Sequence, residues 1–131
     1  MKKFIFLLIG ILALSTTALA EDYQFISAAE LQKRIEANEQ GLLLDIQVEE
    51  EFSAHHIEDA LATYAYPVKS DQDKQKLQAF VGQVKASEEP VTIICPRGGG
   101  GAKRTYDYLK EQGVAESRLF ILEGGQAKWP Y

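Results

Sequence analysis

Hydrophobic and polar residues follow two distinct patterns along the chain. Short, mainly apolar runs predict strands buried in a parallel sheet at 42–46, where only Asp45 interrupts the run, at 91–94 and at 119–122, with a weaker strand at 60–64. Apolar residues at helical spacing predict helices over 28–38, from Ser70 through Val84 and from Ala102 through Leu109, and a short helix is expected over 49–54. Because strands and helices alternate, the sequence predicts an α/β domain with a mainly parallel sheet.

Local signals at the helix ends support these boundaries. Ser27 and Glu30 have the spacing of a capping box, and Ser70 is suited to cap the following long helix. Gly41 and Gly113 come after the first and last predicted helices, where glycine commonly ends a helix.

The first twenty residues are expected to form a separate segment. A basic start precedes an apolar run over 4–14, and small residues at 18–20 suit a signal peptidase. This order is typical of a secretory signal, so we expect cleavage after Ala20, a domain over 21–131 and a periplasmic or secreted protein without stable membrane insertion. An uncleaved membrane anchor is the alternative, but polar residues at 15–17 follow the apolar run directly.

The charge and cysteine content of the chain bear on its binding partners and on its chemistry. The chain carries 14 basic and 19 acidic residues, a formal net charge of −5, which argues against nucleic acid as a partner. Cys95 is the one cysteine, so no internal disulfide can form, although disulfides are common in exported proteins. An unpaired thiol in such a protein calls for a chemical explanation.

Cys95 stands at the carboxyl end of the predicted strand 91–94, and ligands bind at this edge of open parallel sheets. The glycines at 98–101 permit a tight loop whose backbone N–H groups point at the sulfur. Together with the N-terminus of the next helix, these groups favour the reactive thiolate. Positive charge nearby comes from Arg97, Lys103 and Arg104.

The same loop would stabilise a persulfide or a bound oxyanion such as thiosulfate or sulfite. We therefore expect Cys95 to attack the outer sulfur of a donor, hold that atom covalently and pass it to a second nucleophile, without a metal or organic cofactor. The residues expected to bind the substrate are Arg97, Gly98, Gly99, Gly100, Gly101 and Lys103. The alternative is an inert core cysteine, but four glycines and an arginine so close behind it favour the reactive interpretation.

Other glycine-rich loops do not fit the spacing. A Walker loop requires Gly-Lys-Ser or Gly-Lys-Thr, but Ala102 precedes Lys103 and Arg104 follows it. The dinucleotide pattern G-x-G-x-x-G would need glycine at position 103. A cysteine phosphatase loop would need arginine six residues after the nucleophile, where Gly101 stands, so hydrolysis of phosphate esters is disfavoured.

The order of motifs resembles the rhodanese-like family from about Phe25 to Trp129. Three segments resemble the family's first signature, namely LLDIQ at 43–47, EEF at 50–52 and HHIEDA at 55–60. Cys95 heads a loop similar to the family's catalytic loop, and LEGG at 122–125 resembles its closing segment. The resemblance implies a three-layer domain with a mainly parallel five-stranded sheet flanked by helices. It also implies a sulfurtransferase that moves sulfur from a donor such as thiosulfate or polysulfide to a thiophilic acceptor.

The sequence departs from the family pattern where Gln47, Pro96 and Gly100 stand, since the family usually carries arginine at these positions. Pro96 also removes one N–H group from the loop. Arg97 is expected to replace some of the lost charge. Fewer loop arginines leave open an alternative function, a noncatalytic module that delivers sulfur, or another chalcogen such as selenium, to a partner protein.

Four residues in or near these motifs are expected to support the fold and not to take part in the chemistry. His55 and His56 point to different sides of a turn that shapes the fold in the family, so neither is expected to bind a metal. Asp45 is expected to anchor hydrogen bonds at a strand end, and Trp129 is expected to cover the core.

Overall fold

The structure, a computed structural model, describes residues 22–131. The predicted signal segment 1–20 and its cleavage site lie outside the described residues. Within residues 22–131, no helix is long and apolar enough to cross a membrane.

Helices and strands follow the predicted alternation. The helices are α1 (Ala28–Glu36), α2 (Glu49–Ala54), α3 (Asp71–Lys85) and α4 (Gly100–Glu111). The strands are β1 (Phe25–Ile26), β2 (Leu42–Asp45), β3 (Leu61–Ala62), β4 (Val91–Ile94) and β5 (Leu119–Leu122). Two short 3-10 helices flank β5, namely η3 (Glu116–Arg118) and η4 (Gln126–Lys128). The sheet order is β1-β5-β4-β2-β3 with every neighbouring pair parallel, so the predicted parallel α/β fold is confirmed.

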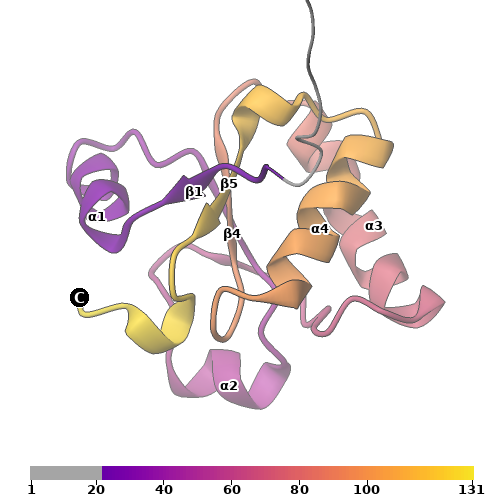
Figure 1. Cartoon of the computed structure of the whole chain (residues 1–131), viewed down its shortest axis with the longest axis horizontal. Helices are drawn as coiled ribbons and strands as arrows, with labels where there is room; N and C mark the ends of the chain where they lie inside the picture. Colours follow the sequence, from indigo (N-terminus) through magenta and orange to yellow (C-terminus); the bar gives the residue numbers. More distant parts are fainter. Residues whose placement is uncertain (1–21) are drawn as a thin grey trace, which may run out of the picture.

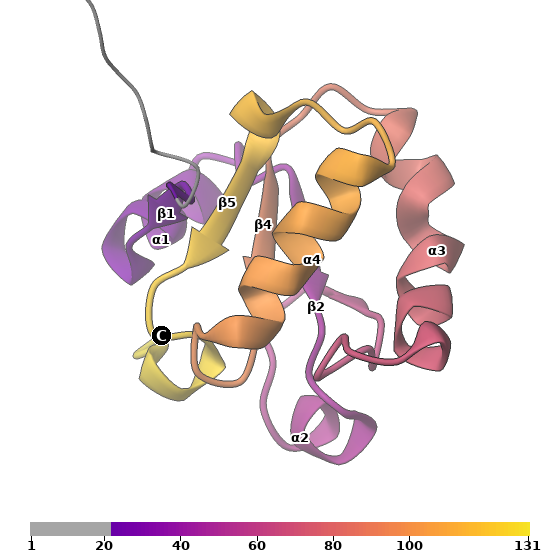
Figure 2. The same ribbon diagram turned by 45° about the vertical axis from the view of Figure 1, so that its right-hand side comes forward.

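The sheet is covered on both faces, which gives the three expected layers (Figures 1 and 2). Successive strand residues point to opposite faces. The core cluster on the side of α3 and α4 includes Leu44, Ile93 and Ile121. The cluster on the side of α1 includes Leu43, Ile94 and Leu122, together with the buried Trp129. Because both faces are buried, these strands are mainly apolar along their length and do not alternate between apolar and polar residues.

Helix ends differ slightly from the prediction for local reasons. Helix α1 ends two residues before position 38, where Asn38 has a φ of 61°. Only half of the expected capping box forms: the Ser27 hydroxyl accepts from the Glu30 N–H at 3.0 Å. The Glu30 carboxylate instead lies 3.5 Å from Arg34 Nε. Ser70 caps α3 as predicted.

The two edge strands are the shortest. Strand β3 covers two residues of the run expected at 60–64, and Tyr64 turns to a φ of 59°. Strand β1 was not located from the sequence, because a two-residue strand carries no periodicity. It pairs with β5, from the other end of the chain.

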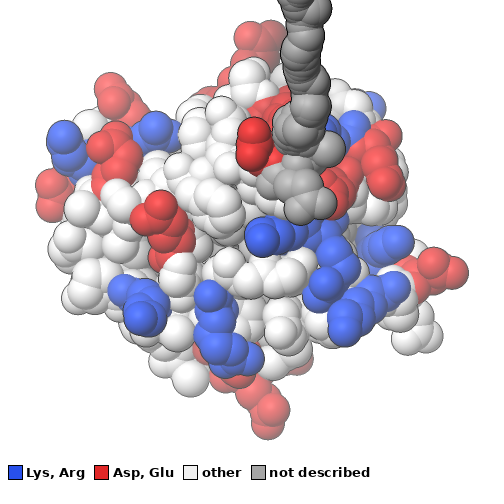
Figure 3. Space-filling view, viewed as in Figure 1, with Lys and Arg blue, Asp and Glu red and all other residues white. Residues whose placement is uncertain are grey.

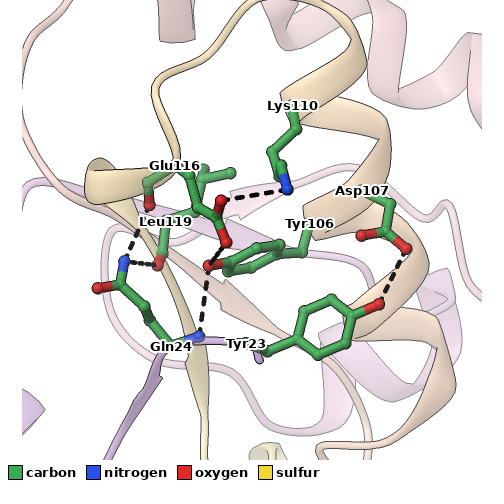
Figure 4. A network of polar contacts seen from close by, with 7 residues as sticks. All are labelled: Tyr23, Gln24, Tyr106, Asp107, Lys110, Glu116 and Leu119. Carbon is green, nitrogen blue, oxygen red and sulfur yellow. Dashed lines mark hydrogen bonds and ion pairs between the residues drawn. The ribbon is translucent and has the colours of Figure 1, made fainter. Parts of the chain in front are cut away.

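A polar network fixes the chain before β1 against α4 (Figure 4). The Gln24 N–H donates to the Tyr106 hydroxyl at 3.3 Å, and this hydroxyl donates to the Glu116 carboxylate at 2.9 Å. The Tyr23 hydroxyl donates to the Asp107 carboxylate at 2.9 Å. These contacts anchor a strand whose two-residue pairing alone would hold it weakly.

The carboxyl ends of β2, β4 and β5 meet at one edge of the sheet, where ligands bind in open parallel sheets. Asp45 at the end of β2 pairs with Ile94 at the end of β4, and Cys95 follows Ile94 directly. Helix α2, the loop between β4 and α4, and η4 gather at this edge (Figures 1 and 2).

Candidate active site

Cys95 lies where β4 leads into the glycine loop, and its side chain is 1% exposed. The N–H groups of Gly98 and Gly99 donate to Cys95 Sγ at 2.7 and 3.2 Å. Hydrogen bonds to sulfur favour its anionic form, which is the nucleophile. The burial alone would suit an inert core cysteine, but two backbone donors aimed at Sγ are the arrangement expected for a thiolate.

Backbone geometry explains why these amides face the sulfur. Gly98 has a φ of 73°, in the left-handed region that glycine tolerates without cost. The Cys95 carbonyl accepts from the Gln126 N–H at 2.8 Å, and the Pro96 carbonyl accepts from the Ala127 N–H at 2.9 Å. The loop therefore turns these two carbonyls toward η4 and its following amides toward Sγ.

The last two glycines of the run, Gly100 and Gly101, belong to α4, whereas the N–H groups that donate to Sγ come from Gly98 and Gly99. Helix α4 is 12 residues long, and its partially positive N-terminus adds to the preference for an anion. A Cβ on Gly101 would lie 2.8 Å from the Tyr66 ring and 3.2 Å from Ile46 Cδ1. No larger side chain fits at this position unless the Tyr66 ring moves.

The basic residues near the loop occupy different positions. Arg97 is exposed and forms no ion pair with any residue in 22–131. Lys103 Nζ lies 5.6 Å from the centroid of the Tyr23 ring, and Arg104 Nε donates to the Pro67 carbonyl at 3.0 Å. Lysine and arginine side chains gather over the N-terminal half of α4 and the start of α3 (Figure 3). Arg97 therefore lies in the sulfur loop itself, whereas Lys103 faces Tyr23 in the segment before β1.

A pocket of about 260 Å³ lies against the start of the loop. Its lining residues come from three segments that are distant in the sequence: Gln47, Glu51, Ala54, His55, Pro96, Arg97, Gln126 and Ala127. Apart from Arg97, the sequence did not assign these residues to the site. Gln47, Glu51 and His55 lie in the motifs LLDIQ, EEF and HHIEDA, so the sequence carried part of the signal, but their position next to the loop depends on tertiary structure.

The Rhodanese-like domain family matches residues 27–130. The chain belongs to this family. Protein HIGH ARSENIC CONTENT 1, mitochondrial, of Arabidopsis thaliana is 29% identical over 89 residues, which are 66% of this chain and 50% of that protein. The chain therefore spans about half the length of that curated relative.

Solved structures show the same rhodanese-like fold. A rhodanese-related protein from Thermoplasma volcanium superposes with a TM-score of 0.55 at 21% identity, covering 82% of this chain and 90% of that one. A rhodanese-like domain protein from Staphylococcus aureus gives 0.57 at 20% identity, covering 81% and 90%. A Rhodopseudomonas palustris protein of unknown function, possible tyrosine phosphatase, gives 0.56 at 12% identity, covering 88% and 93%. At these identities the likeness concerns the fold alone.

Asp45 anchors the end of β2 in this rhodanese-like domain, as its position in the motif indicated. Its buried carboxylate accepts from the Gln47 N–H at 2.8 Å and from Gln47 Nε2 at 3.1 Å. Desolvation by burial raises the pKa of Asp45. The two hydrogen bonds from Gln47 lower it by a smaller amount, and the resulting pKa is about 6. Gln47 Nε2 also donates to the His55 carbonyl at 3.1 Å, so the buried acid fixes one wall of the pocket.

The two histidines of this rhodanese-like domain face different neighbours. His56 stacks on Phe52 with ring centroids 3.9 Å apart, and its Nδ1 lies 2.8 Å from the Phe52 carbonyl oxygen. His55 Nδ1 lies 3.4 Å from Gln126 Nε2. Within residues 22–131, no three His, Cys, Asp or Glu side chains come together as a metal site.

Proposed function

We propose that this protein is a rhodanese-type sulfurtransferase in which Cys95 carries a sulfane sulfur atom as a persulfide. The observation that carries the proposal is the pair of N–H groups, from Gly98 and Gly99, that point at Cys95 Sγ. The same donors suit each anionic state of the cycle, the free thiolate and the bound persulfide.

In the first step, the Cys95 thiolate attacks the outer sulfur of a donor such as thiosulfate or polysulfide. With thiosulfate, the S–S bond of the donor breaks, its electron pair leaves with sulfite, and a new S–S bond forms on Cys95. Arg97 is the cation best placed to hold the sulfonate group, since it is exposed beside the loop.

In the second step, a thiophilic acceptor attacks the outer sulfur of the persulfide. The bond between that sulfur and Sγ breaks, and the electron pair returns to Cys95 as a thiolate that Gly98 and Gly99 stabilise. Neither step needs an external oxidant or reductant.

Hydrolysis of phosphate esters receives no support from the loop. The position six residues after the cysteine is Gly101, and the Tyr66 ring and Ile46 fill the space beside it. An arginine that wrapped the oxyanion from this position would have to displace both side chains.

A noncatalytic sulfur carrier is the second candidate, supported by the 1% exposure of Cys95 and by the missing N–H group of Pro96. A buried persulfide is shielded from small acceptors and suits delivery of sulfur, or of another chalcogen, to a partner protein. Cyanide separates the two functions. A sulfurtransferase turns over thiosulfate and cyanide repeatedly, whereas a carrier loads one sulfur per chain and stops.

Intact mass spectrometry tests the covalent step. The protein is incubated with thiosulfate or inorganic polysulfide, freed of excess donor and weighed, and we expect the gain of one sulfur atom per chain. Cys95→Ser should fold normally by circular dichroism and gain nothing. Sulfur loading of the serine variant would rule out the Cys95 persulfide.

A further inference from the structure

Cations gather on the face formed by the start of α3 and the N-terminal half of α4, which we call the basic face (Figure 3). Its members are Lys69, Lys74, Lys76, Lys103 and Arg104. Within residues 22–131 the ion pairs are Arg34 with Glu30 and Lys110 with Glu116, so no member of the basic face is paired with a carboxylate. The chain as a whole has a net charge of −5, and the basic face therefore differs from the rest of the surface.

A pocket of about 280 Å³ lies in the basic face, and we call it the α3–α4 pocket. Its lining residues are Val68, Lys69, Lys74, Arg104, Asp107, Tyr108 and Glu111. Three cations supply positive charge, while the buried Val68 and the Tyr108 ring supply apolar surface. This mixture suits a carboxylate on a short aliphatic stem, because the stem contacts the apolar atoms and the charge meets the cations.

Arg104 connects the α3–α4 pocket to the sulfur loop. Its Nε donates to the Pro67 carbonyl at 3.0 Å, which fixes the guanidinium. Its Nη1 would lie 2.9 Å from a Cβ on Gly100, the first residue of α4. Gly100 follows Gly99, whose N–H donates to Cys95 Sγ. The basic face therefore reaches the edge of the sulfur loop, and one of its cations is already held in position for a carboxylate.

Two carboxylates near the basic face have other partners. Asp73 accepts from the N–H groups of Lys69 and Ser70 at 3.0 and 3.2 Å, at the start of α3. Asp107 accepts from the Tyr23 hydroxyl at 2.9 Å. Because these carboxylates are held by other donors, the cations of the basic face keep their charge for a binding partner.

We infer that the basic face docks an acidic segment of a partner protein, and that one carboxylate of this segment enters the pocket between Lys69, Lys74 and Arg104. Charge complementarity is the basis for this occupant. Asp107 and Glu111 lie further along α4, so they repel a second carboxylate and keep the segment at the end that borders the sulfur loop. A protein docked there lies beside Cys95, which suits delivery of sulfur to a partner, but the docking itself does not require the sulfur chemistry.

Binding of a defined acidic peptide tests the inference. The probe is a fluorescein-labelled peptide of alternating glutamate and serine, and the reference probe carries glutamine at every glutamate position. Fluorescence anisotropy is measured with the protein at about 0.15 M salt, where long-range attraction between exposed charges is largely screened. We expect the acidic peptide to bind at least about fivefold more tightly than the reference peptide.

Two variants locate the binding site. Lys69→Gln and Lys74→Gln should each weaken binding of the acidic peptide by about fivefold, the effect of one exposed charge contact. The matched controls are Lys33→Gln on α1 and Lys128→Gln on η4, because both residues are exposed and neither lines the α3–α4 pocket. Each control removes one positive charge and should change binding little. In NMR spectra, the acidic peptide should shift the amide signal of Arg104 and leave those of α1 in place.

Three results would overturn the inference. Equal losses in the pocket variants and in their controls would mean that overall charge explains binding. Self-association of the wild type that is lost in Lys74→Gln would make a second copy of this chain the occupant. Binding to phosphatidylglycerol vesicles without binding to the acidic peptide would assign the basic face to a membrane surface.

The test is independent of the proposed sulfurtransferase function. Cys95→Ser should bind the acidic peptide as tightly as the wild type, because Cys95 does not line the α3–α4 pocket. Peptide binding without sulfur loading would support the docking surface and contradict the persulfide chemistry. Sulfur loading without peptide binding would do the reverse.

Discussion

Gly125 packs against the backbone of Cys95 so closely that a Cβ on Gly125 would overlap the Cys95 carbonyl oxygen. The same atom would lie 2.5 Å from the Gly98 nitrogen and 2.7 Å from the Arg97 nitrogen. Gly125 also has a φ of 61°, which favours glycine. The closing segment of the domain is therefore a direct support of the sulfur loop.

Gly125→Ala should consequently damage both stability and chemistry. The added methyl group must displace the loop backbone, and we expect a loss of about 2 kcal/mol in the free energy of unfolding. Sulfur loading should fall in the folded fraction, because the Gly98 N–H shifts away from Sγ. Chemical denaturation and intact mass measure the two effects.

Gly82→Ala in α3 is the control, because a Cβ added there would have no atom within 4 Å. This substitution should stabilise the protein by about 0.5–1 kcal/mol. Unchanged loading in the Gly125 variant would show that the loop does not depend on this support.

The position of Cys95 could be predicted from the sequence because its determinants are local. A β-branched apolar run ends at Ile94, and four glycines follow within a few residues, so the strand end and the loop are adjacent in the chain. The support from Gly125 could not be predicted in the same way. It depends on β5 lying beside β4, a pairing between segments that are distant in the sequence.

The positions of Arg97 and Lys103 also show that nearness in the sequence does not determine which side chains lie at the loop. Arg97 and Lys103 are both close to Cys95 in the sequence, and both were expected to bind substrate. Arg97 lies in the loop itself, whereas Lys103 lies on α4, whose rotation carries its side chain to the Tyr23 ring. Helical spacing predicts that Tyr106 and Leu109 face the core, but the packing of Tyr23 against α4 joins segments that are distant in the sequence and is not specified by local spacing.

The raised pKa of Asp45 predicts a specific pH dependence of stability. Between about pH 4 and 6 the folded protein holds a proton on Asp45 that the unfolded chain has lost, so this group stabilises the fold at acidic pH and the effect is lost as the pH rises through 6. A shift from 3.8 to about 6 corresponds to roughly 3 kcal/mol. The free energy of unfolding of the wild type minus that of Asp45→Asn should therefore be larger at pH 4 than at pH 7 by this order of magnitude.

Asp73 is a control for Asp45, because its pKa is shifted in the opposite direction. Slight burial of the Asp73 carboxylate raises its pKa. The N–H groups of Lys69 and Ser70, which donate to this carboxylate at 3.0 and 3.2 Å, act in the opposite direction, and the net effect is a lowered pKa. Its contribution to stability is present above the ordinary pKa of the group and is lost as the pH falls, so the difference between the wild type and Asp73→Asn should shrink toward pH 3. If the difference in unfolding free energy between the wild type and Asp45→Asn stayed the same from pH 4 to pH 7, burial would not raise the pKa of Asp45.

Tyr106→Phe should loosen the edge of the sheet. It removes the acceptor of the Gln24 N–H and the donor to Glu116, and we expect a loss of about 1–2 kcal/mol in the free energy of unfolding. Hydrogen exchange at Gln24 should accelerate as well. Tyr108→Phe loses a hydroxyl contact with Gln78 at the surface and should change stability by less than about 0.5 kcal/mol. Equal effects of the two substitutions would mean that the network in Figure 4 does not hold β1.

The last prediction separates the two tasks of the loop, holding the sulfur and recognising the donor. The Gly98 and Gly99 amides contact Sγ, whereas Arg97 points away from the core and is exposed. Arg97→Ala should therefore lower kcat/KM for thiosulfate by about fivefold, the value of one exposed charge contact of about 1 kcal/mol. Loading from inorganic polysulfide, which has no sulfonate group, should fall less.

The comparison is made on the plateau of the pH–rate profile of each variant, where the rate no longer depends on pH. Lys103→Ala is the matched variant, since it removes one positive charge from a residue that lies beside Tyr23 and away from the pocket. We expect it to affect both donors slightly and equally. If Arg97→Ala also affects thiosulfate and polysulfide equally on the plateau, Arg97 acts on the loop or its thiolate, and recognition of the sulfonate must come from the backbone amides alone.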